Sequence, residues 1–114
     1  VLRMKAGSAP RLDRRIVILQ ASFAENEAGE DVATGWAEYA EERAEYTPVS
    51  DGERMRAASV EQKTDARFVV RCSTRLAAVS GENRIRFDGA DWQITGVKEL
   101  GRGLWIEITA WRIR

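Results

Sequence analysis

The chain contains no histidine and only one cysteine, Cys72, among its 114 residues. Without histidine it cannot hold a Ser–His or Cys–His nucleophile pair, or a zinc site with imidazole ligands. A single cysteine cannot form an internal disulfide, and low cysteine content is typical of a reducing cytoplasm. The Gly-x-x-x-x-Gly-Lys phosphate-binding pattern is also missing, and Gly101-Arg102-Gly103 is too short to cradle a phosphate. We therefore expect no enzyme activity, no cofactor and no metal ion.

Long apolar runs are missing as well. No stretch approaches the roughly 20 apolar residues that a membrane-spanning helix needs, so we expect no membrane partner. Hydrophobic residues make up 44% and charged residues 32% of the chain, which is typical of a folded globular protein. The length predicts a single domain over residues 1–114, with residues 1–10 as a flexible N-terminus.

The net charge of zero hides a strong segregation along the chain. Residues 21–53 hold ten acidic side chains and one basic one, whereas the segments on either side are basic. A neutral total argues against a dedicated nucleic-acid binder. The acidic segment is either a solvated loop, or a surface that complements basic parts of another subunit or repels nucleic acid.

Short segments of alternating or continuous apolar character predict at least five β-strands. Asp88-Gly89 separates two of them and is a strong hairpin signal, and Gly96 marks a bulge, because the apolar pattern changes phase there. Closely spaced strands of this kind predict a small antiparallel barrel or sandwich. The expected strands are Arg15–Gln20, Arg67–Cys72, Arg84–Phe87, Trp92–Leu100 and Leu104–Trp111.

Alternation within these strands predicts which side chains face the core. In the last strand Leu104, Ile106, Ile108 and Ala110 share one face, which we assign to the core. Phe68, Val70 and Cys72 share the inner face of an earlier strand, where a buried, inert thiol is expected.

The middle of the chain is less regular. Residues 25–31 predict a loop. Residues 34–46 fit two structures, because their Ala and Glu content favours a helix whereas an alternating pattern within them fits a strand. Local propensity alone favours the helix. Ser50 or Asp51 is expected to cap a short helix over Glu53–Ala58.

Trp105 and Trp111 lie on the face of the last strand opposite the aliphatic one. Either this strand is buried on both sides, or the rings cover a helix, or they form a subunit interface, where tryptophan is enriched. Stacking on nucleic acid is a further alternative, although only Arg112 and Arg114 are close in sequence.

Four glutamates, Glu38, Glu41, Glu42 and Glu45, follow one another closely. Paired carboxylates carry out acid–base catalysis in glycosidases, but proximity in sequence does not establish the separation that such a pair needs. We interpret this run as a solvated face.

The order of these features resembles that of the phage head–tail joining proteins, also called head-closure, stopper or connector proteins. The resemblance runs from about Gly7 to Trp111, and no single motif carries it. It rests on the segments Leu12-Asp13-Arg14-Arg15-Ile16, Ala33-Thr34-Gly35-Trp36-Ala37-Glu38, Ser50-Asp51-Gly52-Glu53-Arg54, Thr64–Arg71 and Arg84-Ile85-Arg86-Phe87-Asp88-Gly89 followed by Trp92.

The resemblance implies a mainly β fold: a small antiparallel six-stranded β-barrel with one short helix and a long loop or arm, in which residues 34–47 become a strand or an extended arm. It also implies a ring, a hexamer or dodecamer, below the portal of a phage, prophage or gene-transfer-agent particle. Such a ring extends the DNA channel without sequence-specific binding, closes the head, contacts the portal or adaptor protein and attaches the tail. The location is then the virion neck, with the bacterial host cytoplasm during assembly. The alternative function is an oligonucleotide-binding small β-barrel module. The candidate residues for the subunit interface or channel are Glu38, Glu41, Glu42, Glu45, Asp51, Glu53, Trp105 and Trp111.

Overall fold

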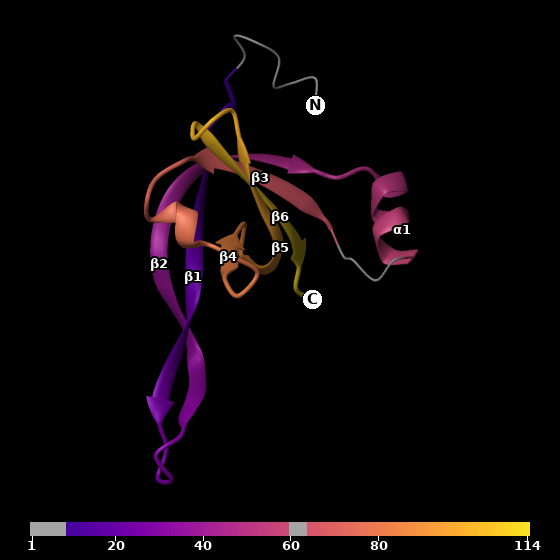
Figure 1. Ribbon diagram of the computed structural model, residues 1–114. Helices are drawn as coiled ribbons and strands as arrows, with labels where there is room; N and C mark the ends of the chain where they lie inside the picture. The colour runs from indigo at the N-terminus through magenta and orange to yellow at the C-terminus, as the bar shows by residue number, and fades with distance from the viewer. Residues whose placement is uncertain (1–8, 60–63) are drawn as a thin grey trace.

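A computed structural model of the chain describes residues 9–59 and 64–114. Six antiparallel strands close into a barrel in the order β1-β2-β3-β6-β5-β4 (Figure 1). The expected fold is therefore confirmed, whereas most of the expected flexible N-terminus, residues 1–10, lies outside the described residues. The elements are β1 (Arg14–Glu25), β2 (Asp31–Pro48), α1 (Asp51–Ser59), β3 (Ala66–Arg71), the 3-10 turn η2 (Leu76–Ala78), β4 (Arg84–Phe87), β5 (Ala90–Leu100) and β6 (Trp105–Arg112).

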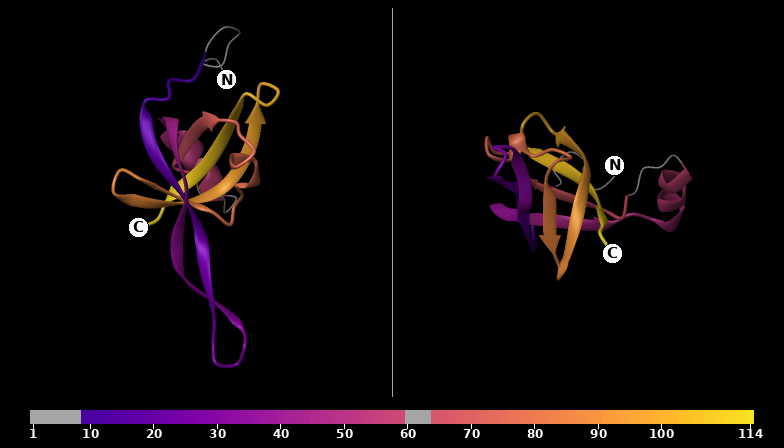
Figure 2. Two further views of the ribbon diagram at one scale, coloured as in Figure 1. Left: turned by 90° about the vertical axis from the view of Figure 1, so that its left-hand side faces the viewer. Right: turned by 90° about the horizontal axis from the view of Figure 1, so that it is seen from below.

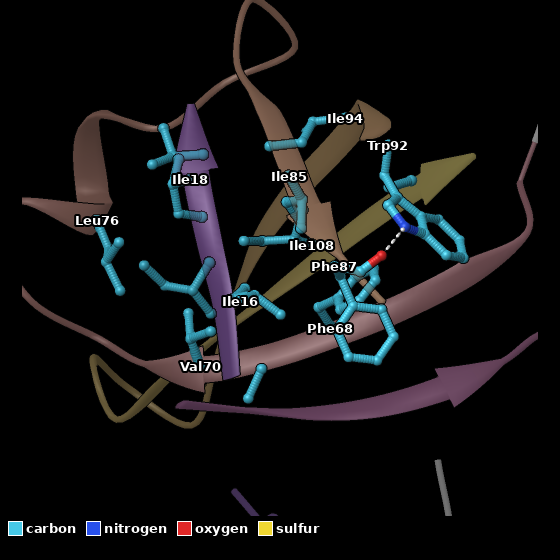
Figure 3. Packing of buried hydrophobic residues seen from close by; sticks show 14 of the residues in the cluster. Ile16, Ile18, Phe68, Val70, Leu76, Ile85, Phe87, Trp92, Ile94 and Ile108 are labelled. Carbon is cyan, nitrogen blue, oxygen red and sulfur yellow. Dashed lines mark hydrogen bonds between the residues drawn. The ribbon is translucent and has the colours of Figure 1, made fainter. Parts of the chain in front are cut away.

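The barrel interior is filled by apolar side chains from all six strands (Figure 3). Four aromatic rings gather in it, those of Tyr46, Phe68, Phe87 and Trp92, with centroids 4.9–6.2 Å apart. The indole Nε1–H of Trp92 donates to the Phe87 carbonyl at 3.2 Å, so the one polar atom of this buried ring is satisfied. Because these rings fill the interior, the barrel offers no internal ligand chamber at this point.

The second half of the chain follows the sequence pattern closely. Asp88 and Gly89 both have positive φ, 55° and 72°, as a two-residue hairpin turn requires. The register between β5 and β6 shifts between Ile94 and Gly96, which confirms the bulge. One prediction is wrong: Leu104 is 59% exposed. It lies in the turn before β6, where its N–H donates to the Gly101 carbonyl, so the core face of β6 begins only at Ile106.

Residues 34–46 form part of the long strand β2, and the helix favoured by local propensity is wrong. The strand pairs with β1 along almost its whole length, from Asp31 opposite Glu25 to Ala44 opposite Arg14. Its alternation places Ala44 and Tyr46 against the core. Pairing with β1 and β3 thus satisfies the backbone of this segment and buries its small and aromatic side chains, which outweighs a few tenths of a kcal/mol of helix propensity per residue.

Beyond the barrel, β1 and β2 continue as a two-stranded hairpin, the arm, which we define as residues 20–36 (Figure 1). β1 pairs with β4 only at residues 17–19, and β2 pairs with β3 only at residues 44–48, so the arm strands have only each other. The turn expected at residues 25–31 covers 26–30. In it the Asn26 side chain accepts the N–H groups of Ala28 and Glu30, each at 2.9 Å. The arm gives the molecule extents of 55 × 34 × 25 Å (Figure 2).

Helix α1 stands to one side of the barrel (Figures 1 and 2). The Ser50 hydroxyl accepts the Glu53 N–H at 3.2 Å, which confirms a capped helix start at the expected place, although the helix runs from Asp51 to Ser59. This helix is too short and too polar to cross a membrane, and no other described segment contains a membrane-spanning helix.

Candidate interaction surfaces

The arm, residues 20–36, carries four acidic side chains and no lysine or arginine. From Ile16 to Glu42 the chain has seven acidic side chains and no lysine or arginine. Glu25 pairs directly with Asp31 across the arm, and Glu27 and Glu30 lie in the turn. Like charges opposite one another destabilise a strand pair, so the Glu25–Asp31 pair destabilises the isolated arm.

The base of the arm is fastened to the barrel by two arginines. The Arg84 guanidinium lies over the Trp36 ring at 4.3 Å, and that of Arg75 lies over the Tyr39 ring at 4.4 Å. Arg75 also donates to the Tyr39 carbonyl, and the Tyr39 hydroxyl donates to the Arg75 carbonyl at 2.6 Å. These contacts join the base of the arm to the start of β4 and to the segment before it, so the arm is held in one direction.

The four glutamates of β2 do not form a site. Glu41 faces Arg15 at 3.6 Å, and Glu45 accepts the Arg11 N–H at 3.0 Å. Glu42 lies two residues before the inward-facing Ala44, on the same face of the strand, and is half-buried, whereas Glu38 is exposed. The carboxylates are thus spread along the strand, and the described residues contain no group of acidic or cysteine side chains arranged to hold a metal ion.

Glu53 links α1 to the outer wall of the barrel. Its carboxylate accepts hydrogen bonds from both terminal nitrogens of Arg67 on β3. The same guanidinium lies 3.8 Å from Glu107 on β6, whose carboxylate also lies 3.5 Å from the Lys98 ammonium. The hydrogen bond that Arg67 donates to Glu53 outweighs burial and raises the pKa of Arg67. Glu107 is only 4% exposed, so its neighbouring cations compensate the cost of burying its charge.

A second cluster fastens α1 to the end of β6. The Asp65 carboxylate, 15% exposed, lies 3.1 Å from Arg54 and 3.2 Å from Arg114 and accepts the Arg112 N–H at 2.8 Å. Burial by itself raises the pKa of Asp65. The hydrogen bonds from Arg112 and Arg114, with the charges of Arg114 and Arg54, outweigh burial and hold that pKa below its usual value.

An open hollow of about 670 Å³ lies beside the Asp65 cluster. Met55 and Arg54 of α1 line it on one side, and Trp111, Arg112 and Arg114 line it on the other. The half-buried Trp111 therefore lines the same hollow as α1, and the expectation that the two rings cover a helix stays a prediction. Asp51, at the start of α1, is exposed and lies 3.9 Å from Arg54 at the rim of the hollow.

Trp105 lies at the other end of β6 and does not join Trp111. Six residues of strand separate them, which is roughly 20 Å. The Arg71 guanidinium lies 5.1 Å from the Trp105 ring, so one face of this ring is already covered. The two tryptophans are therefore two separate surface features.

Sequence reasoning missed Asp65, Arg75 and Arg84. Asp65 holds groups from α1 and β6 together, and the two arginines hold the arm. Each acts through a residue far away in the chain, so no local pattern identifies it. The only available signal is the position of Arg84 at the start of an alternating strand.

Solved structures with the same fold support this arrangement. The solution structure of protein SF1141 from Shigella flexneri 2a has a TM-score of 0.71 and 20% identity, covering 90% of this chain and 93% of that one. A chain from the virion of a native gene transfer agent particle has a TM-score of 0.60 and 24% identity, covering 92% of this chain and 98% of that one. At these identities the likeness shows the fold alone. No curated protein matches the chain significantly.

The sequence itself identifies the family. Residues 7–113 match the family model described as phage head completion protein, which is nearly the whole chain. This match agrees with the six-stranded barrel and with the fold found in a gene transfer agent virion. The chain therefore belongs to the phage head completion protein family, which points to a structural role in the virion rather than to an enzyme.

Proposed function

We propose that this protein forms a ring in the neck of a phage-like particle, between the portal or adaptor protein and the tail. The ring, a hexamer or dodecamer, extends the DNA channel, closes the filled head and attaches the tail. The chain assembles from the host cytoplasm. Support comes from the family and from the shape of the molecule, because a closed barrel with a projecting arm suits a subunit that must hold neighbours.

The segregation of charge is the observation that carries this proposal. A ring needs surfaces that complement one another from subunit to subunit. Residues 21–53 supply an acidic surface, and the segments before and after it supply basic ones. A channel that lets DNA slide must not bind phosphate tightly, so an acidic lining also suits a conduit. We therefore assign Glu38, Glu41, Glu42 and Glu45 to the channel or to a neighbouring subunit.

The arrangement of aromatic rings does not favour the oligonucleotide-binding alternative. Binding single strands needs exposed rings next to basic groups. Most rings of the barrel are in its core, and arginines cover Trp36, Tyr39 and Trp105, which leaves Trp111 beside Arg112 and Arg114 as the one place on the described barrel where a half-buried ring lies next to basic groups. A gel-shift titration at low salt tests this, and salt-dependent binding of single strands would favour the alternative.

Electron microscopy of particles from producing cells tests the proposed ring. We expect density for this chain as a ring between the head and the tail. If the chain lies outside the neck, the proposal is wrong. If the β2 carboxylates all lie on the outer rim, far from any neighbour, the assignment of the acidic segment is wrong. Mass measurement of the free protein then shows whether rings form without a platform.

A further inference from the structure

We infer that the arm of one copy docks in the hollow between α1 and the end of β6 of a second copy. This inference rests on the proposed ring and identifies the contact that would join its subunits. It follows from two surfaces of the chain that share no contact within one copy and that match each other in chemistry.

The first surface is the outer part of the arm. Phe23 is 63% exposed and Val32 is 42% exposed, so two of the five large exposed apolar side chains of the described chain lie on this thin hairpin. Phe23 lies on the same face of the hairpin as the Glu25–Asp31 pair, whereas Val32, which pairs with Ala24, lies on the opposite face, so a partner must contact both faces of the arm. An apolar side chain left in water next to repelling carboxylates stabilises nothing in the isolated chain, whereas both features gain from a partner that is apolar and basic.

The second surface is the hollow. Its floor is apolar, with Met55 73% exposed and the Trp111 ring beside it. Arg54, Arg112 and Arg114 surround this floor. Asp65 compensates Arg54 and Arg114, but within residues 9–59 and 64–114 no carboxylate lies within 4.0 Å of the Arg112 guanidinium. Asp51 and Asp65 also line the hollow, so its three arginines leave a net charge of +1, which together with the apolar contact matches the acidic arm.

The arm cannot reach the hollow of its own chain. In Figure 1 the arm points away from the barrel at the bottom of the molecule, whereas α1 lies beside the barrel on the right. The contacts of Arg75 and Arg84 with Tyr39 and Trp36 hold the arm base against the barrel. A contact between two different surfaces of identical chains is heterologous, and such contacts generate closed rings when the rotation closes.

A disulfide crosslink tests this contact. Val32→Cys and Met55→Cys are combined in a Cys72→Ser background, and particles or isolated rings are oxidised and run on a non-reducing gel. We expect a ladder of crosslinked chains. Each single-cysteine variant should give none of the ladder. The pair of Val32→Cys with Leu104→Cys should give none either, because Leu104 is also exposed, at 59%, but lies in a turn and does not line the hollow.

A charge exchange provides a second measurement. Glu25→Arg together with Asp31→Arg keeps a like-charge pair across the arm, so the hairpin itself changes little. Arg112→Glu reverses the hollow. Each variant alone should give about tenfold less crosslink than the parent. A mixture of the two should recover it, because each arm then meets a hollow of opposite charge.

The outcomes separate this inference from the ring itself. If electron microscopy shows rings and the Val32–Met55 ladder is missing, the inference is wrong and the proposed function stands. If the hollow in those rings holds DNA, the tail or the portal protein, the inference is equally wrong. If no ring forms anywhere, both fail. A ladder together with recovery on mixing supports both.

Discussion

Replacing Asp65 by asparagine removes one charge from the cluster that joins α1 to β6 and leaves the shape of the side chain unchanged. Asparagine can still accept the Arg112 N–H. The substitution therefore removes only the contribution of the negative charge to the interactions with Arg54, Arg114 and the Arg112 N–H. Ion pairs with Arg54 and Arg114, whose side chains are 47% and 64% exposed, contribute up to about 1 kcal/mol each. A backbone hydrogen bond to a charged acceptor adds about 1 kcal/mol over a neutral one. With discounting for solvent screening, we expect Asp65→Asn to lower the free energy of unfolding by about 2 kcal/mol.

The pH dependence of this loss has a definite sign. Because the fold lowers the pKa of Asp65, its charge stabilises the folded state fully above the ordinary aspartate pKa of about 3.9. The contribution disappears as the pH falls through the lowered pKa of the folded state. The difference between the wild-type protein and Asp65→Asn should therefore be constant near neutral pH and vanish in acid.

Urea denaturation followed by circular dichroism measures this difference at several pH values, with an unchanged slope on urea as the sign of an unchanged folded state. Asp88→Asn is the matched control, because it removes the same charge from an exposed turn and asparagine tolerates the positive φ of that position. Its effect should stay within about 0.5 kcal/mol. A loss for Asp65→Asn that persists in strong acid, or equals that of the control, would refute the reasoning.

Three further predictions concern the core, the helix and the arm. Phe68→Ala should cost about 3–5 kcal/mol in urea denaturation, because the ring is fully buried among three other aromatic rings; Phe68→Leu should cost much less. Ser50→Ala should destabilise α1 by about 1 kcal/mol, seen as faster hydrogen exchange in its first turn, while urea unfolding of the barrel stays unchanged; a lower free energy of unfolding of the barrel would contradict this. Arg84→Ala should raise hydrogen exchange along the arm by removing a contact worth about 0.5–1 kcal/mol with Trp36, whereas Arg102→Ala, in an exposed turn, should not.

The candidate residues show where sequence reasoning ends. Trp111 and Glu53 were identifiable because a tryptophan on the polar face of a strand and a carboxylate at a helix start are unusual or favoured locally. Their surroundings were not identifiable, because Arg67, which binds Glu53, and Asp65, which lines the same hollow as Trp111, come from other parts of the chain. Leu104 shows a different error. It fits the apolar alternation of the last strand, but β6 begins only at Trp105, so Leu104 is exposed in the turn before the strand.

Local chemistry within the sequence determined the late strands, the Asp88-Gly89 turn, the Gly96 bulge and the Ser50 cap, because each depends on a few adjacent residues. It also ruled out histidine-based catalysis. Only the tertiary structure decided that residues 34–46 are a strand, because their partners on β1 and β3 are distant in the chain and a sheet offers them hydrogen bonds and burial that an isolated helix does not. Likewise, Glu25, Glu27, Glu30 and Asp31 project from the barrel on the arm only because β1 and β2 are longer than the barrel that they help to close.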